Sequence, residues 1–233
     1  MQRTGLRFSQ LLIVGALACC AAACSESARS AAAEVSGEDL RRLPPDRKET
    51  LPDVMMQHAD HGRTLGADSV KLSVLVISDY QCTACRTWFE RVLPVIRSEY
   101  IDRGLARLAW VHYPLRGHPS AVRAASAALC ASAQDKFWEA SAQLFATQDR
   151  WSAAADANTM IDSIASAPGI DALALQRCAQ SGRMLRQVRA DIDWVDAAKA
   201  GTPPLIVIGT HRVTGDAPLA SLRAVIDSAI AGK

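Results

Sequence analysis

The sequence has very little net charge. Its 26 Lys and Arg residues face 24 Asp and Glu residues, so the formal net charge is +2. A protein that binds nucleic acid through its phosphates needs a concentrated excess of basic side chains. The near balance of charges therefore argues against a nucleic-acid partner.

Aromatic residues are also scarce, at 5% of the chain, and much of the 49% hydrophobic share is alanine. Alanine favours helices, whereas strands favour aromatic and β-branched side chains. A charged share of 21% beside this hydrophobic content excludes a wholly disordered or collagen-like chain. We therefore expect the 233 residues to form a helix-rich globular protein with a modest strand core.

Long hydrophobic runs are missing except near the amino terminus. There, Arg3 and Arg7 precede an apolar run at residues 11–18, which is shorter than the about 20 residues of a membrane-spanning helix. Basic residues, a short apolar run and then small residues are typical of an export signal. We predict a signal peptide over residues 1–24, with the rest of the chain outside the cytoplasm.

Small residues directly precede Cys24, as they do at the acylated cysteine of a bacterial lipoprotein. We expect a lipid anchor at Cys24 and a location in the periplasm or cell envelope. A competing site at Cys19, or plain secretion after a small-residue cleavage site, is the alternative.

Residues 25–65 are rich in Ser, Ala, Glu, Arg and Pro, including Pro44 and Pro45, and show no sustained apolar period. This composition is typical of a flexible tether. His58 and His61 are candidate metal ligands at its end, but no further ligand cluster supports a metal site, so we interpret them as solvated surface residues.

A cysteine pair follows the first apolar run of strand length. Residues 71–78 are rich in β-branched side chains and predict a central strand. Cys82 and Cys85 come next, and apolar residues then recur at helical spacing over residues 88–100. The pair is therefore expected at a strand-to-helix junction, with Cys82 at the helix N-terminus.

This position favours redox chemistry. Free N–H groups and the helix dipole stabilise a thiolate at Cys82, which makes it the attacking sulfur, and Cys85 lies one turn away, within reach for a reversible disulfide. The alternatives are a zinc half-site and an inert structural disulfide. No second Cys or His pair at ligand spacing supports zinc.

The segment around the cysteines resembles the DsbA-like branch of the thioredoxin superfamily, a family of exported thiol:disulfide oxidoreductases. The resemblance runs from about residue 66 onward and covers nearly all of the remaining chain. It is carried by the residues that lead into the motif, by a proline in the first helix, and by the crossing after the next predicted strand at 105–113: Ser78, Asp79, Tyr80, Gln81, Pro94, Pro114, Leu115, His118 and Pro119.

The resemblance continues at Gly201, Thr202 and Pro203, which precede the apolar run 205–208. In the family, a cis-proline loop precedes the fourth main strand and faces the substrate. The resemblance therefore implies that Pro203 is the cis proline and that Thr202 pairs with an extended substrate segment. Only an X-Pro bond adopts cis at low cost, and an ordinary Pro-Pro turn with Pro204 is the alternative.

The predicted fold class is α/β, a thioredoxin fold with an inserted all-helical subdomain. Residues 66–118 and 199–233 would form the thioredoxin domain, and residues 119–198 the helical insertion. A hairpin at 205–208 and 212–214 is expected before a last helix capped by Asp216. Apolar periodicity predicts helices within the insertion at 121–133, 136–146, 158–165, 171–180 and 184–198.

Of the seven cysteines, those outside the export segment and the redox pair are Cys130 and Cys178. Some relatives carry a disulfide in the helical subdomain, which implies a structural bridge between them. Two buried free thiols are the alternative.

The residues around the motif indicate a mild redox potential. Strong oxidases of the family place Pro and His between the cysteines, whereas this chain has Thr83 and Ala84. Several relatives keep a buried carboxylate at the position of Val76. Asp79 is nearer to the motif, but the sequence shows no route by which it acts on Cys85.

Three functions remain open from sequence. The first is general disulfide exchange with protein thiols or disulfides through the cysteine pair, without another cofactor and with a membrane redox partner. The second is reduction of one dedicated client. The third, from another class, is a thioredoxin-fold lipoprotein that binds metal or a client. No dimerisation segment is evident, so we expect a monomer.

Overall fold

The sheet is built around the strand that precedes the cysteines. The computed structural model describes residues 60–165 and 168–232. Its five-stranded sheet has the order β1-β3-β2-β4-β5. The central strand β2 (Ser73–Ser78) is parallel to β3 (Arg107–His112) and antiparallel to β4 (Leu205–Ile208). The short strands β5 (His211–Thr214) and β1 (Thr64–Leu65) close the two edges.

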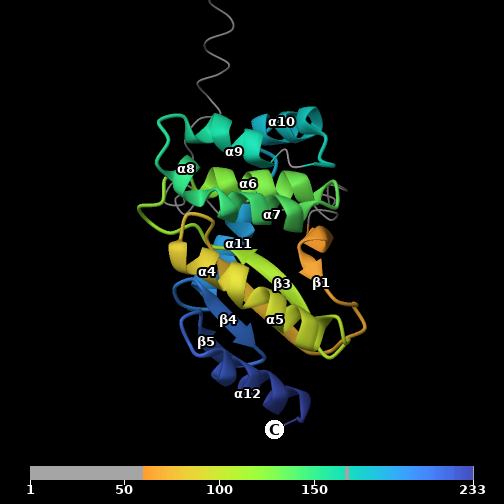
Figure 1. Ribbon diagram of the computed structural model, residues 1–233. Helices are drawn as coiled ribbons and strands as arrows, with labels where there is room; N and C mark the ends of the chain where they lie inside the picture. The colour runs from red at the N-terminus through yellow and green to blue at the C-terminus, as the bar shows by residue number, and fades with distance from the viewer. Residues whose placement is uncertain (1–59, 166–167, 233) are drawn as a thin grey trace, which may run out of the picture. The chain divides into compact units, whose positions relative to one another are not determined.

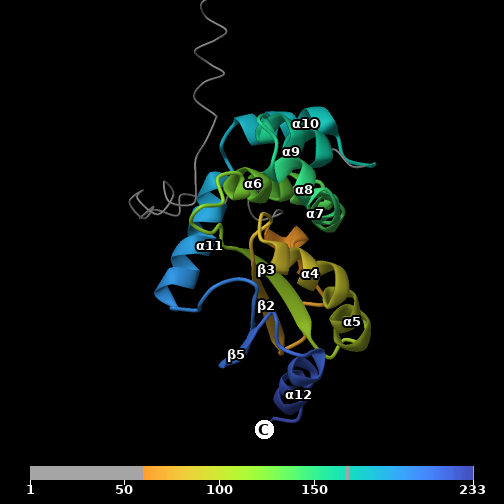
Figure 2. The same ribbon diagram turned by 60° about the vertical axis from the view of Figure 1, so that its left-hand side comes forward.

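The helix after the cysteines is divided by a proline. Helix α4 (Thr83–Arg91) ends before α5 (Leu93–Ile96), which carries Pro94 in its first turn, and a π-helical turn η2 (Arg97–Ile101) follows. Proline lacks the N–H that would continue the α4 hydrogen bonds, which explains the division. Figure 2 shows α4 and α5 on one side of the sheet and α11 (Leu185–Ala197) on the opposite side.

The predicted helical insertion is present between β3 and β4, and its helices α6 to α10 gather above the sheet in Figure 1. All five helices predicted for the insertion agree with observed helices to within one residue at each end, and the predicted fold is confirmed. The short α8 was not predicted. The helices of the insertion before α11 are α6 (Ala121–Ser132), α7 (Phe137–Ala146), α8 (Gln148–Ser152), α9 (Ala157–Ala165) and α10 (Ala172–Gln180).

One hydrophobic core joins the sheet to the insertion. Tyr80, in the loop after β2, packs against Phe145 of α7 with ring centroids 4.9 Å apart and ring planes inclined by 44°. The ring of Trp110 in β3 lies 6.1 Å from that of Phe145. All three side chains are almost completely buried. Because the insertion packs directly beneath the cysteine loop, its side chains are in position to shape the site.

The expected domain boundary at residue 66 is too late. Thr64 and Leu65 pair with β3, and Arg63 is buried against Asp191 of α11. The sequence suggested a tether because this segment is polar. It is attached to the domain through a buried arginine and not through a run of apolar side chains, so hydrophobic periodicity does not reveal it. The remaining predicted tether, the signal peptide, Cys24 and His58 lie outside the described residues.

Asp216 does not cap the last helix. Helix α12 (Leu219–Ile230) has Pro218 at its N-cap without a side-chain hydrogen bond, because a turn closed by the Ala217 N–H on the Thr214 carbonyl comes first.

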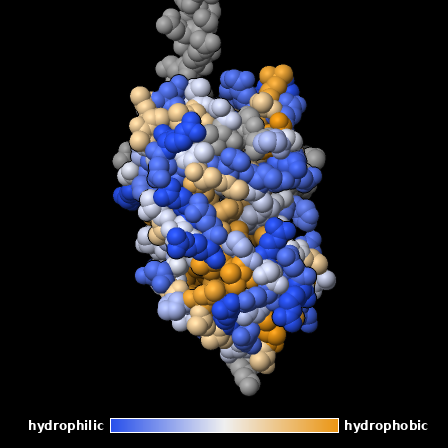
Figure 3. All heavy atoms as spheres, viewed as in Figure 1, coloured by the Kyte–Doolittle hydropathy of each residue, from blue (hydrophilic) through white to orange (hydrophobic). Residues whose placement is uncertain are grey.

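Within the described residues, no helix is long and apolar enough to cross a bilayer. The surface drawn in Figure 3 mixes hydrophilic side chains with a patch of hydrophobic ones below its middle.

Candidate active site

Cys82 is held at the positive end of α4. It is the N-cap residue, with φ −81° and ψ 120°, and its Sγ accepts a hydrogen bond from the Cys85 N–H at 3.3 Å. The N-cap places a side chain over the free N–H groups of the first helical turn. The sequence prediction of a cysteine at the helix start therefore corresponds to the observed geometry.

The two thiols have different environments. They are not bonded to each other in this structure; Cys82 is partly exposed, whereas Cys85 is completely buried. A hydrogen bond from the Cys85 thiol lowers the pKa of Cys82 to about 7, although burial and the charge of Asp79 oppose this. Burial, followed by the interaction with Cys82, raises the pKa of Cys85 far above that of an ordinary thiol. Near neutral pH, Cys82 is thus the thiol that ionises, whereas Cys85 stays protonated.

Asp79 lies beneath the cysteine loop. Its side chain is completely buried, and its carboxylate accepts hydrogen bonds from the N–H groups of Gln81 and Leu115, both at 2.7 Å. The same oxygen that accepts from Leu115 lies 2.7 Å from Nδ1 of His118. The Asp79 carbonyl accepts the Cys82 N–H at 3.2 Å. Asp79 therefore connects the cysteine loop with the crossing that follows β3.

His118 adds a titratable side chain to the site from outside the cysteine motif. Its hydrogen bond to Asp79 raises its pKa against the effect of burial, and the charges of Asp79 and Cys82 add to the increase. The sequence argument for a mild potential considered only Thr83 and Ala84, the residues between the cysteines. The structure adds His118, which a distant loop brings to the Asp79 carboxylate.

Gln148 is a second site residue that the sequence reasoning missed. It is buried at the start of α8, and its Nε2 donates hydrogen bonds to the carbonyls of Tyr80 at 2.6 Å and Cys82 at 3.0 Å. One carboxamide thus fixes the backbone on both sides of Gln81. No local pattern distinguishes this glutamine from the exposed ones nearby.

The cis bond lies one residue later than expected. It joins Pro203 to Pro204, so Pro203 and not Thr202 is the residue before the cis proline. Both bonds precede a proline, so either can adopt cis at low cost, and the sequence alone does not distinguish them. The carbonyl of Pro204 accepts the Gly215 N–H at 2.8 Å, which ties it to the hairpin beside β4. Pro203 is buried and Thr202 is exposed.

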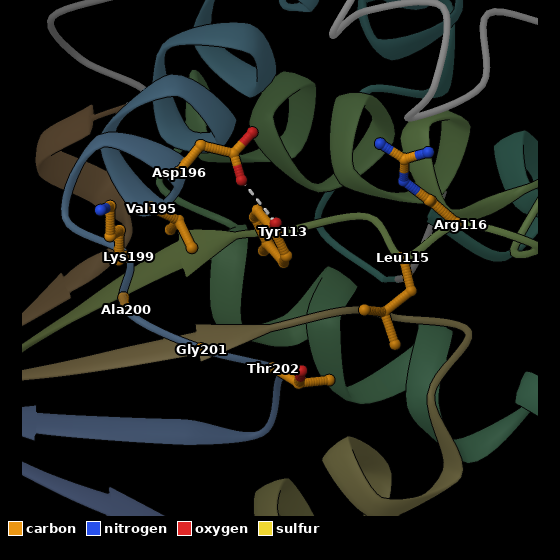
Figure 4. Close-up of a pocket in the computed structure, with 9 residues that line it drawn as sticks. All are labelled: Tyr113, Leu115, Arg116, Val195, Asp196, Lys199, Ala200, Gly201 and Thr202. Atoms are coloured by element: carbon orange, nitrogen blue, oxygen red, sulfur yellow. Dashed lines mark hydrogen bonds between the residues drawn. The ribbon is translucent and has the colours of Figure 1, made fainter.

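Thr202 lines a pocket of about 510 Å³ beside the Pro-Pro loop. Figure 4 shows its walls, with the loop after β3 on one side and the end of α11 and the segment leading to Thr202 on the other. The Tyr113 hydroxyl donates to Asp196 across it at 2.6 Å. Leu115 belongs both to this pocket and, through its N–H, to the Asp79 network, so the pocket borders the cysteine loop.

The remaining cysteines lie in the insertion. Cys130 of α6 and Cys178 of α10 form a disulfide, with Cα atoms 5.8 Å apart. Among residues 60–165 and 168–232, no group of three or more His, Cys, Asp or Glu side chains is arranged to hold a metal ion.

Known proteins resemble the chain in both sequence and fold. A family model described as thioredoxin matches residues 58–228. A curated relative named "Probable disulfide bond formation protein D", from Bacillus anthracis, is 28% identical over 168 residues, which cover 71% of this chain and 76% of the relative.

Two solved structures share the fold. The oxidised BdbD of Bacillus subtilis superposes with a TM-score of 0.67 at 21% identity, covering 74% of this chain and 95% of that one. Chlamydia trachomatis DsbA gives a TM-score of 0.64 at 17% identity, covering 82% of this chain and 97% of that one. The protein belongs to the thioredoxin family, and it shares its fold with these two solved structures.

Proposed function

We propose that the protein is a thiol:disulfide oxidoreductase that exchanges disulfides with protein substrates through Cys82 and Cys85. The observation that carries this proposal is the asymmetry of the pair, a partly exposed Cys82 at a helix N-terminus beside a buried Cys85. The relative named as a disulfide bond formation protein supports the same activity.

Exchange by the oxidised protein begins with a substrate thiolate. It attacks Sγ of Cys82, the bond between Cys82 and Cys85 breaks, and Cys85 leaves with the electron pair and takes up a proton. A second substrate thiolate then attacks the substrate sulfur of the mixed disulfide, and Cys82 departs as the thiolate. Two electrons pass from substrate to protein, and the reverse sequence reduces a substrate disulfide.

The Cys82 environment supports a mild potential. Cys-X-X-Cys proteins have nucleophile pKa values from about 3.5 in the strongest oxidants to about 7 in thioredoxin. The pKa of about 7 at Cys82 corresponds to the upper end of this range. A less stabilised thiolate makes the reduced form less favoured, so the protein should oxidise substrates less strongly than the most oxidising members.

The exposed Thr202 and the neighbouring Pro203 form the substrate-facing edge in this proposal, and the adjoining pocket accommodates a substrate side chain. The signal-peptide pattern supports export, and the small residues before Cys24 support a lipid anchor there. In this proposal the protein acts at the periplasmic face of a membrane, where a membrane partner re-oxidises or reduces it. We propose a monomer that works with the cysteine pair as its only redox group.

Two measurements test the proposal. Equilibration with glutathione gives the redox potential, at about 30 mV per tenfold change in the equilibrium constant, and thereby distinguishes an oxidant from a dedicated reductant. Cys85→Ala should accumulate mixed disulfides with substrate proteins, whereas Cys82→Ala should form none. Trapping by Cys82→Ala instead would reverse the two roles. Stoichiometric metal on the reduced protein, without exchange activity, would favour a metal-binding lipoprotein.

A further inference from the structure

The exchange steps themselves do not require the pair Asp79 and His118, yet the Asp79 carbonyl accepts the Cys82 N–H and the Asp79 carboxylate contacts His118. The Asp79 side chain has no exposed surface, whereas 28% of the His118 side chain is exposed. Among residues 60–165 and 168–232, His118 is the only side chain in hydrogen-bond contact with the Asp79 carboxylate. A buried carboxylate therefore reaches solvent through one imidazole.

The loop that carries His118 is hydrogen-bonded to the cysteine loop on both sides of the histidine. Leu115 donates its N–H to Asp79 at 2.7 Å, and Ser120 donates its N–H to the Gln81 side chain at 3.0 Å. His118 lies between these two attachments, opposite residues 79–82. The imidazole is thus held against Asp79 of the cysteine loop by a loop that backbone hydrogen bonds fix in place.

We propose that His118, oriented by Asp79, is a positioning residue for exchange that keeps a positive charge beside the Cys82 sulfur. This inference rests on the proposed function, because it explains how the thiolate of that reaction is maintained. When His118 is protonated, its charge offsets that of Asp79. When it loses its proton, the buried Asp79 charge is left facing the thiolate, and like charges in a buried site oppose each other.

The other charged groups on elements around the pair are His112, Arg86 and Arg116, and His112 and Arg86 contact carboxylates elsewhere in the fold. On the cysteine side, Arg86 of α4 binds Asp149 of α8 at 2.8 Å. From β3, the buried His112 contacts Asp191 of α11. Arg116 lies in the same loop as His118 and is exposed. The second thiol, Cys85, remains protonated near neutral pH because burial raises its pKa.

The interaction must be reciprocal. If His118 stabilises the Cys82 thiolate by a certain factor, the thiolate stabilises protonated His118 by the same factor. The hydrogen bond to Asp79, with smaller contributions from the charges of Asp79 and Cys82, raises the pKa of His118. The charge of Asp79 opposes the lowering of the Cys82 pKa by the hydrogen bond from Cys85. Thiolate and imidazole therefore titrate as a coupled pair.

The first arm of the test follows Cys82. Thiolate absorbance of the reduced protein is recorded against pH for wild type, His118→Gln and the matched control His211→Gln, which removes an exposed histidine of β5. Glutamine is neutral at every pH. We expect His118→Gln to raise the Cys82 pKa by about 0.5 or more, with at least about a threefold lower equilibrium constant for oxidising glutathione, and His211→Gln to match wild type.

The second arm measures the pKa of His118 by NMR in the wild-type protein and in Cys82→Ser. Serine removes the thiolate but leaves the histidine in place, so this arm remains decisive even if His118→Gln fails to fold. The His118 pKa should fall by the amount by which His118→Gln raises that of Cys82. In an Asp79→Asn background, the effect of His118→Gln on Cys82 should change, because the carboxylate that orients the imidazole is absent.

An unchanged His118 titration in Cys82→Ser, or a Cys82 pKa in His118→Gln equal to that in His211→Gln, would overturn the inference. These measurements require no substrate. If the two pKa values are coupled but no substrate is turned over, the proposed function fails and the charge coupling stands. If exchange proceeds normally without the coupling, only this inference fails.

Discussion

Replacing Arg63 with methionine tests whether the segment before Gly66 is part of the folded domain. Arg63 donates to both carboxylate oxygens of Asp191, at 2.5 and 3.0 Å, and the two side chains are 11% and 6% exposed. Asp191 also accepts the His112 N–H at 2.8 Å. Removing one partner of a buried ion pair leaves an uncompensated charge, which typically costs about 3–5 kcal/mol. Arg63→Met should therefore lower the free energy of unfolding by about that amount.

The pH dependence of stability gives a second, independent estimate of what the Arg63–Asp191 ion pair contributes. Burial alone would raise the pKa of Asp191, but the charge of Arg63 and hydrogen bonds from His112 and Arg63 outweigh it and hold the pKa at about 2. The ordinary value is 3.8. Because the folded pKa is depressed, the stabilisation is present above pH 4 and is lost as the pH falls through 2. The difference corresponds to roughly 2 kcal/mol.

Urea unfolding at pH 7, and then at points between pH 4 and 2, measures both effects. The matched control is Arg97→Met, which breaks an ion pair to Asp102 whose side chains are 53% and 57% exposed, and should cost at most about 1 kcal/mol. In Arg63→Met the free energy of unfolding should also fall less between pH 4 and 2 than in the wild type, since Asp191 has lost its main cationic partner. Equal midpoints for the two variants would refute a buried ion pair and restore a boundary at Gly66.

Three further outcomes are expected. Gln148→Met should cost about 1–3 kcal/mol by leaving the buried Tyr80 carbonyl unpaired, and should change the glutathione equilibrium, whereas Gln143→Met, on an exposed position of α7, should change neither. Replacing Cys130 and Cys178 together with serine should lower stability by up to about 4 kcal/mol in urea unfolding, and a stability equal to wild type would show that the bridge constrains little. A fragment beginning at Gly66 should unfold at lower urea than one beginning at His58, because it lacks Arg63 and β1; equal midpoints would contradict that role.

Local patterns predicted the elements well because their causes are local. The β-branched run at 71–78 contains β2 (Ser73–Ser78), and helical apolar spacing placed α11 and α7 within one residue at each end. Strand β1 and helix α8 were missed, since two and five residues are too few to show a period. Their presence depends on partners elsewhere in the chain, namely β3 for one and the cysteine loop for the other.

The active site likewise has a part that local sequence predicts and a part that depends on distant residues. The position of Cys82 at the helix start follows from neighbouring residues, and the sequence predicted it. The partners of the cysteine loop come from far along the chain: His118 is 39 positions after Asp79, and Gln148 is 66 positions after Cys82. A histidine or a glutamine has many exposed counterparts in the sequence. Only the folded chain shows which of them is buried against the cysteine loop.

This division changes how the residues between the cysteines are interpreted. Thr83 and Ala84 indicated a mild potential because neither carries charge, and that argument considers only charges within the helix turn. A loop that follows β3 brings His118 to the same thiolate through Asp79, so the electrostatic effect of a histidine is available without one inside the motif. Unlike the fixed dipole of α4, this contribution titrates with pH. Because loss of the His118 proton raises the pKa of Cys82, the thiolate fraction of Cys82 should rise with pH less steeply than a single isolated ionisation requires.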